Sequence, residues 1–133
     1  PSGRYFTLYK RWHLIGLEVG VSVASVALRG EPTGVATAWN ADVVATAKRD
    51  LQPGELLDGE GGYTVWGKLL PAATSTRLGG LPLGLAHGIK VVRPVKKGQS
   101  LSWADVAIDT TTHAYKIRRE MESLFAAPLL KAA

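Results

Sequence analysis

The side chains best suited to bind a ligand in this sequence are the polar and cationic ones of "YKRWHLIGLE", residues 9–18. Tyr9, Lys10, Arg11 and His13 precede an apolar stretch that reads as a helix, so they would lie near its N-terminal end. Cationic donors there could hold a carboxylate or a phosphate by charge-assisted hydrogen bonds, and the unpaired N–H groups of a first helical turn would add to the attraction. The alternative is a boundary turn with exposed charges, and the sequence leaves both interpretations open.

A second candidate for anion binding is "GYTVWGKL", residues 62–69, which has most of a phosphate-loop pattern. Gly62, Gly67 and Lys68 are in place, but Leu69 stands where a Ser or Thr would hold magnesium. The intervening residues are strand formers, which do not leave backbone amides free to surround a phosphate. We therefore interpret the match to the phosphate-loop pattern as coincidental. The sequence also contains no G-x-G-x-x-G fingerprint after a strand, so a nicotinamide site would have to lie outside this chain.

The glycines of "LLDGEGGYTV" allow a third interpretation. Gly59, Gly61 and Gly62 are most simply explained by a tight loop, because glycine accepts backbone conformations that other residues avoid. Asp58 and Glu60 could form a carboxylate pair for acid–base work, but two solvated side chains in a loop are the better interpretation.

Metal sites and several classes of partner are disfavoured by composition. His13, His87 and His113 are widely separated, and the 133 residues include no cysteine, so we expect no metal site and no disulfide. A net charge of +5 without a basic stripe interleaved with aromatics disfavours nucleic acid. The apolar run 14–28 is shorter than the roughly 20 residues of a membrane span, and Glu18 interrupts it. We expect a cytoplasmic protein that does not contact a membrane.

Three parts of the chain must position these residues. Residues 1–41 are expected to contain a strand over 4–9, a helix within 13–30 that ends at Gly30, and a linker. Valines at alternate positions from 19 to 23 would also fit a strand, but small residues four apart favour the helix. Residues 42–109 alternate short β-branched runs with Gly and Pro, which predicts a compact β unit.

The last part, residues 110–133, is predicted to be a helix and a tail. The polar cluster "DTTT" is a natural N-cap for a helix over residues 114–125. Apolar side chains recur there at helical spacing while the charged ones mostly face elsewhere, which predicts a terminal helix docked through its apolar face. The apolar positions are Ile117, Met121, Leu124 and Phe125.

The β unit contains an internal repeat. When Gly54 is aligned with Gly98, Arg49 aligns with Arg93, Leu51 with Val95 and Leu57 with Leu101. A glycine at the same place in both copies is what a turn with positive φ requires. The repeat therefore predicts a pseudo-symmetric unit built from two strand–turn–strand motifs.

The segments "VVATAKRDLQPGELLDGEGGYTVWG" and "LPLGLAHGIKVVRPVKKGQSLSWADVAID" resemble a SAF domain, the module shared by sialic acid synthases, antifreeze proteins, altronate dehydratases and flagellar P-ring assembly proteins. The resemblance implies a β-clip fold for residues 42–109, with flanking helices, in a chain that is mainly β.

The flanking segment "YKRWHLIGLEVGVSVASVALRGEPTG" and the "GEGGYTV" string make the resemblance narrower. Together they resemble the C-terminal region of homoserine dehydrogenase-like NAD(P)-dependent oxidoreductases, in which a Rossmann domain comes first, then a catalytic and dimerisation region, then the SAF module. The resemblance implies a homo-oligomeric parent enzyme that uses NAD(P) on a small hydroxy- or oxo-acid or a sugar phosphate. Residues 1–41 would be a strand–helix remnant of the catalytic region, with Tyr9, Lys10, Arg11 and His13 facing the substrate, and this chain alone would bind no cofactor and would not be active.

The alternative is a self-standing SAF module that binds an anionic sugar or a protein partner without catalysis. Lys48, Arg49 and Tyr63 would then line its binding surface. A self-standing module has no need of the 9–18 element and the helix after it, which distinguishes the two hypotheses.

Overall fold

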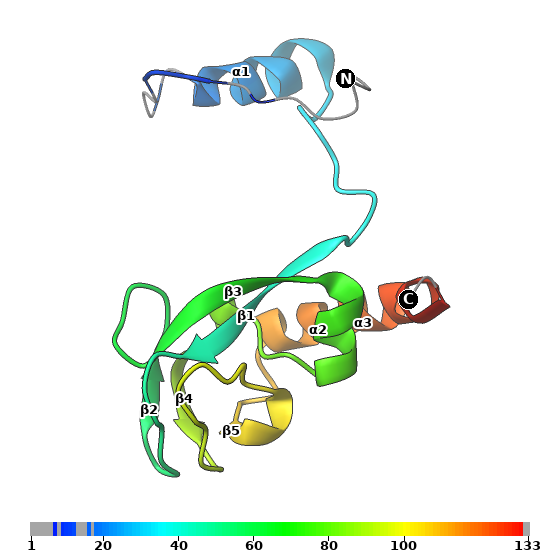
Figure 1. Cartoon of the computed structure of the whole chain (residues 1–133). Helices are drawn as coiled ribbons and strands as arrows, with labels where there is room; N and C mark the ends of the chain where they lie inside the picture. The colour runs from blue at the N-terminus through cyan, green and yellow to red at the C-terminus, as the bar shows by residue number, and fades with distance from the viewer. Residues whose placement is uncertain (1–6, 8, 13–15, 17, 132–133) are drawn as a thin grey trace. The chain divides into compact units, whose positions relative to one another are not determined.

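The computed structural model of the chain describes residues 7, 9–12, 16 and 18–131, with the side chains of the last helix described as far as Phe125 (Figure 1). The chain folds as two compact units, residues 1–37 and residues 38–133. Within the described part of the chain, no helix is both long enough and apolar enough to cross a membrane.

The described residues of the first unit include a continuous helical segment. Helix α1, Val19–Ala24, runs directly into η1, Ser25–Arg29, which has π-helical hydrogen bonds. Gly30 ends the segment in the left-handed conformation with φ 66°, as its position in the sequence predicts. The helical interpretation is confirmed from residue 19 onward, whereas residues 13–15 and 17 and most of the expected strand at 4–9 lie outside the described residues.

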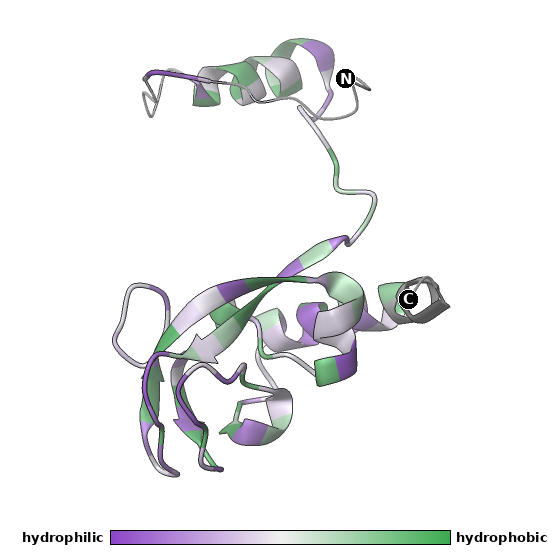
Figure 2. Cartoon of the chain, viewed as in Figure 1, coloured by the Kyte–Doolittle hydropathy of each residue, from purple (hydrophilic) through white to green (hydrophobic). Residues whose placement is uncertain are grey.

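The second unit is built on two small antiparallel sheets. Strands β1, Ala41–Ala47, and β3, Val65–Pro71, form a two-stranded ribbon in continuous register. Strands β2, Leu56–Asp58, β4, His87–Val91, and β5, Val106–Ala107, form a three-stranded sheet in the order β2-β4-β5. Figure 2 shows apolar residues along β1 and β3 with a few polar ones between them. The last four residues of β1, 44–47, are all buried, so this end of the strand is covered on both faces.

Helical segments flank these sheets, and the expected class, mainly β with flanking helices, is confirmed. They are α2, Ala72–Leu78, the single-turn segments η2, Leu83–Leu85, and η3, Trp103–Asp105, and the long helix α3, His113–Lys131. The sheets close on one apolar core, whose larger buried members are Leu51, Leu57, Val65, Leu81, Val91, Val95 and Leu101.

The internal repeat predicted from the sequence is present in the backbone. Leu51 and Val95, which the repeat aligns with each other, form a bridge in which the N–H of each donates to the carbonyl of the other, over 2.8 and 3.0 Å. Gly54 and Gly98 have φ values of 96° and 81°. The glycines are therefore needed for the positive φ of two equivalent turns, and the Leu51–Val95 bridge lies between the two copies.

Helix α3 begins where the polar cluster predicts. Thr112 accepts hydrogen bonds from the Lys116 N–H at its carbonyl oxygen and from the Tyr115 N–H at its hydroxyl, over 3.1 and 3.4 Å. Asp109 closes the preceding turn by accepting from the N–H of Thr111 at 2.8 Å.

The face through which α3 docks agrees with the sequence prediction only in part, because Met121 and Phe125 are half-buried but the other two predicted apolar positions are not. Ile117 and Leu124 are at least half exposed, whereas the side chain of Arg118 is only 13% exposed and that of Glu122 only 15%. The reason is electrostatic: the surface below α3 presents the buried carboxylate of Asp42, which requires a cationic partner. Hydrophobic periodicity alone cannot detect such a requirement.

Candidate functional site

The segment between β2 and β3, which we call the glycine loop (residues 58–64), is held closed by one carboxylate. Asp58 accepts hydrogen bonds from the N–H of Tyr63 at 2.5 Å, from the N–H of Thr64 at 3.0 Å and from the Thr64 hydroxyl. The N–H of Asp58 donates in turn to the Thr64 hydroxyl oxygen at 3.0 Å. The loop is thus fixed from within by hydrogen bonds between its own residues.

The charge state of Asp58 follows from these contacts. Burial raises the pKa of the carboxyl, but the hydrogen bonds from the Thr64 hydroxyl and from the N–H groups of Tyr63 and Thr64 outweigh burial and lower the pKa to about 2. Asp58 is therefore a carboxylate at neutral pH that accepts hydrogen bonds from loop donors, a structural role rather than that of a proton donor.

The glycines serve the geometry of the loop. Gly59 and Gly61 have φ values of 72° and 79°. A Cβ atom on Gly62 would overlap the Asp58 carboxylate. The structure therefore confirms that these glycines form a tight loop and gives a specific reason for glycine at each position. Glu60 is an exposed residue of the same loop.

Two of the three residues of the binding-module hypothesis meet at this loop. The Lys48 N–H donates to the Thr64 carbonyl at 2.9 Å, and its ammonium donates to the Gly62 carbonyl at 2.5 Å. The side chain of Tyr63 is 87% exposed beside it. Arg49 instead turns to Glu55, with 2.5 Å between Nη2 and Oε2. The structure thus provides an exposed aromatic ring and a cation on a rigid loop, which is an arrangement suited to binding rather than to bond-making.

The phosphate-loop pattern lies in a strand, as the sequence analysis predicts. Gly67 and Lys68 belong to β3, where Lys68 is paired with Val44 of β1. Strand residues engaged in a ladder cannot direct successive N–H groups at one phosphate.

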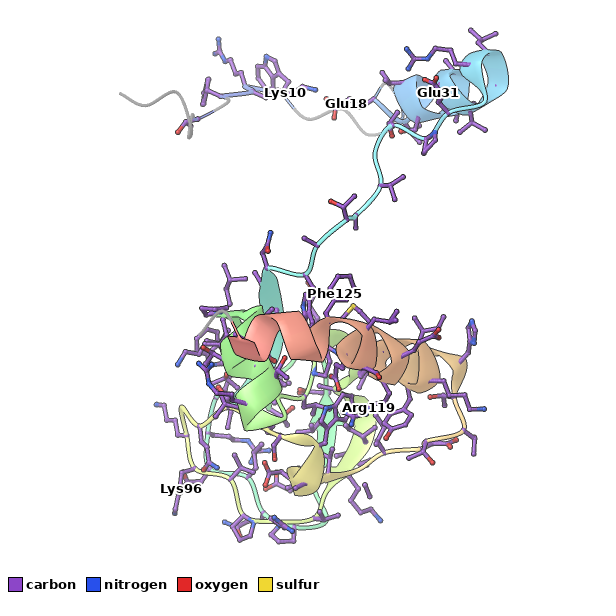
Figure 3. The ribbon with its side chains drawn as sticks, turned by 90° about the vertical axis from the view of Figure 1, so that its right-hand side faces the viewer. Lys10, Glu18, Glu31, Lys96, Arg119 and Phe125 are labelled. Carbon is purple, nitrogen blue, oxygen red and sulfur yellow. The ribbon has the colours of Figure 1, made fainter. Side chains whose placement is uncertain are left out.

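The cationic cluster of the first unit is only partly described. Lys10 forms an ion pair with Glu18 (Figure 3). Arg11 lies over the indole ring of the next residue, 5.3 Å from its centre. Tyr9 is 83% exposed, and His13 lies outside the described residues. Three of the four candidates are thus described, and no bond or ion pair joins them to one another.

The other two histidines lie on different elements and do not form a common site. His87 begins β4, and its Nδ1 is 3.1 Å from the Asp58 carbonyl oxygen, while His113 begins α3. Among the described residues, no group of three His, Cys, Asp or Glu side chains is arranged to hold a metal ion.

A polar cluster that was not predicted from the sequence lies beneath α3. Arg118 donates to both carboxylate oxygens of Asp42, at 3.0 and 2.6 Å, and Ser75 of α2 donates to the same carboxylate at 2.5 Å. The Arg118 guanidinium also lies 4.8 Å from the ring centre of Trp39 and pairs with Glu122 at 2.8 Å. Only the i, i+4 spacing of Arg118 and Glu122 is visible in the sequence. Burial makes the pKa of Asp42 rise, but the hydrogen bonds of Arg118 and Ser75 more than offset this and lower it.

A cavity of about 330 Å³ adjoins this cluster between α2, η3 and α3. Arg119 lies there with its guanidinium 5.5 Å from the ring centre of Trp103, and it pairs with Glu122 (Figure 3). The cavity is lined by Ser75, Thr76, Gly79, Trp103, Arg119, Glu122 and Ser123. The guanidinium of Arg119 is already paired with Glu122. We therefore interpret the cavity as a gap between packed elements rather than as a binding site.

Comparison with known proteins agrees with this architecture. No curated protein matches the chain. The family model described as the SAF domain matches residues 42–107, which run from the second residue of β1 to the end of β5 and include both turns and the glycine loop. Residues 42–107 of this chain are therefore a SAF domain.

Proposed function

We propose that this chain is the SAF-bearing C-terminal region of an NAD(P)-dependent oxidoreductase of the homoserine dehydrogenase type, and that it is not catalytically competent alone. The parent enzyme would act on a small hydroxy- or oxo-acid or on a sugar phosphate. The proposal rests on the sequence resemblance and on one structural observation, the exposure of the helical segment in the first unit.

That segment is apolar on more than one side. Val19 and Val23 are one helical turn apart in α1, Val23 and Val26 line one surface hollow, and Val21 and Leu28 line another. All five side chains are more than half exposed in the chain as described. A helix that is apolar on both sides is stable in water only when other elements cover both sides, and each buried side chain contributes about 1.5–3 kcal/mol.

The SAF domain has its own core and does not require this helix for its packing. A helix of this kind is expected in the interior of a larger catalytic and dimerisation region. In the proposed enzyme, Tyr9, Lys10, Arg11 and His13 lie on the substrate side of that region.

The nicotinamide cofactor does not fit the described residues. Their sheets are antiparallel, and the described chain contains no parallel strand–helix–strand unit that would place a pyrophosphate at a helix N-terminus. NAD(P) would be held by the Rossmann domain of the parent enzyme, and no step of the reaction is assigned to this chain.

The first test is the mass of the native polypeptide in its source cells, detected with an antibody raised against this chain. We expect a mass severalfold above 14.2 kDa and NAD(P)-dependent turnover by that polypeptide. In that enzyme, Arg11→Ala and His13→Ala should each lower kcat/KM. A native mass of 14.2 kDa would remove the oxidoreductase proposal.

The helix itself can be tested in the same enzyme. The double substitution Val21→Ser and Leu28→Ser should destabilise the catalytic region and lower its Tm, because it places two hydroxyls on a buried face. Val35→Ser is the control, because Val35 follows the helical segment and belongs to neither of its apolar sides. Equal effects of the two changes would show that the helix is not buried in the enzyme.

A second candidate function is supported by the glycine loop. A self-standing SAF module would use the rigid loop, with Tyr63 exposed and Lys48 beside it, to bind an anionic sugar or a protein partner. In that case Tyr63→Ala should abolish binding while the helix substitutions leave it unchanged.

A further inference from the structure

The two turns related by the internal repeat make the same backbone hydrogen bonds. The Gly54 N–H donates to the Val91 carbonyl, and the Gly98 N–H donates to the Ala47 carbonyl, each over 2.8 Å. In the alignment of the repeat, which is a shift of 44 positions, the donor Gly54 corresponds to the donor Gly98 and the acceptor Ala47 corresponds to the acceptor Val91. The environments of the two turns can therefore be compared residue by residue.

The last residue of each turn has the same side-chain orientation. Glu55 accepts the N–H of Gln52 through Oε1 at 2.7 Å. Gln99, its equivalent, accepts the N–H of Lys96 through Oε1 at 3.2 Å. The second terminal atom of each side chain is thus placed alike, but it is a carboxylate oxygen in Glu55 and an amide nitrogen in Gln99.

Several residues differ between the two turns, and the exchange of Glu55 for Gln99 is the one that removes the carboxylate with which Arg49 pairs. In the first turn, Oε2 of Glu55 accepts a hydrogen bond from Nη2 of Arg49 at 2.5 Å. In the second turn, the equivalent arginine is Arg93, and the amide nitrogen of Gln99 is a donor that cannot accept from it. No carboxylate in the described part of the chain pairs with Arg93, which is exposed. Arg93 therefore lacks the acceptor that Glu55 provides for Arg49, and the Gln99 amide nitrogen is a further donor in the place of that acceptor.

The same surface carries a surplus of positive charge. Asp50 accepts from the ammonium of Lys96 at 2.8 Å and from the N–H of Lys97 at 2.9 Å. The Lys97 ammonium has no ion-pair partner among the described residues, and Lys96 projects from the turn into solvent (Figure 3). Arg93 and Lys97 are thus two uncompensated cations on one turn.

We propose that Arg93, Gln99 and Lys97 form a docking site for an acidic segment of a partner protein. One carboxylate of that segment accepts hydrogen bonds from Arg93 and from the Gln99 amide nitrogen, and so replaces the pairing that Glu55 gives Arg49 in the first turn. A second carboxylate pairs with Lys97. The site is independent of the oxidoreductase assignment.

The surroundings favour an acidic protein segment over other anions. The turn is exposed, and the cavities of about 330 and 230 Å³ in this unit are lined by other residues, so the ligand must lie on an open surface. Residues 90–99, "KVVRPVKKGQ", include no aromatic side chain on which a nucleic-acid base could stack. The first turn shows that a carboxylate is the group this geometry accepts.

The test measures binding of a fluorescein-labelled octaglutamate peptide to the full chain by fluorescence anisotropy at low ionic strength. Gln99→Glu should fill the site with an internal carboxylate and weaken binding about fivefold, as should Arg93→Ala. Thr110→Glu is the charge-matched control, because Thr110 is exposed and lies outside both turns, and it should change affinity much less. Glu55→Gln should create a second site at Arg49 and strengthen binding.

Each outcome decides the proposal. Loss of binding in Gln99→Glu and Arg93→Ala, with Thr110→Glu near the native affinity, supports the site. Equal losses in Gln99→Glu and Thr110→Glu would show attraction to net charge alone and overturn it. The proposal is also overturned if the native chain does not bind the peptide, or if a labelled single-stranded oligonucleotide binds more tightly with the same dependence on Arg93.

Discussion

Arg118 of α3 and Asp42 of β1 are 76 positions apart in the sequence and form a two-pronged ion pair, with donor–acceptor distances of 3.0 and 2.6 Å. Asp42 is 7% exposed, so its carboxylate has been removed from water and depends on Arg118 and Ser75 for compensation. The pair connects the terminal helix to the ribbon of the SAF domain. It explains why a helix with exposed Ile117 and Leu124 is nevertheless docked.

Removing one partner of this pair should be costly. Arg118→Met leaves the buried carboxylate of Asp42 unpaired, and we expect the free energy of unfolding to fall by about 3–5 kcal/mol. Urea denaturation followed by tryptophan fluorescence measures this, because Trp39 lies against Arg118. Arg119→Met is the matched control: its side chain is 47% exposed, so the loss should be below about 1 kcal/mol. Equal losses in the two variants would contradict the role of the pair, and Asp42→Asn added to Arg118→Met should restore part of the stability.

The carboxylate of Asp58 should make the glycine loop sensitive to acid. Its pKa is about 2 in the folded chain, below the ordinary value of 3.8, so its stabilisation is complete above pH 5 and is lost as the pH falls from about 4 to 2. Asp58→Asn removes the charge and should increase amide exchange at residues 63 and 64 at pH 7, with a cost of about 1–3 kcal/mol. The difference between the native chain and the variant should shrink as the pH approaches 2.

Tyr63→Ala provides the control for this experiment. The Tyr63 ring is 87% exposed, so its removal should change stability by less than about 0.5 kcal/mol while the loop stays closed. A pH-independent difference between Asp58→Asn and the native chain would show that the carboxylate is not what closes the loop.

The two glycines of the repeat should be equally intolerant of a side chain. Gly54 and Gly98 have positive φ and open space around the Cβ position, so the cost of alanine is purely conformational. We expect each of Gly54→Ala and Gly98→Ala to lower the free energy of unfolding by about 1–2 kcal/mol. Gly84 also has open space but no positive φ, so Gly84→Ala should be neutral or stabilising by up to about 1 kcal/mol. Thermal and urea unfolding of the three variants compares them, and a loss in Gly84→Ala as large as in the other two would contradict the argument.

Much of the SAF domain could be predicted from the sequence, because the signals there are local. Glycine at 54 and 98 specifies two turns, the polar cluster before residue 113 specifies the start of α3, and β-branched runs between them specify strands. The pairing of Leu51 with Val95 was also predictable, because a repeat aligns the two residues that a pseudo-twofold arrangement brings together.

The placement of charged side chains could be decided only by the tertiary structure. The sequence cannot show that Asp42 is buried or that Arg118 reaches it. An arginine on a helix is usually exposed unless a carboxylate from a distant part of the chain pairs with it in the interior. It also cannot show that Lys48 and Tyr63 meet at the glycine loop while Arg49 turns away to Glu55. Turns and strands follow from the conformational preferences of neighbouring residues, whereas ion pairs between remote residues exist only after the fold has brought them together.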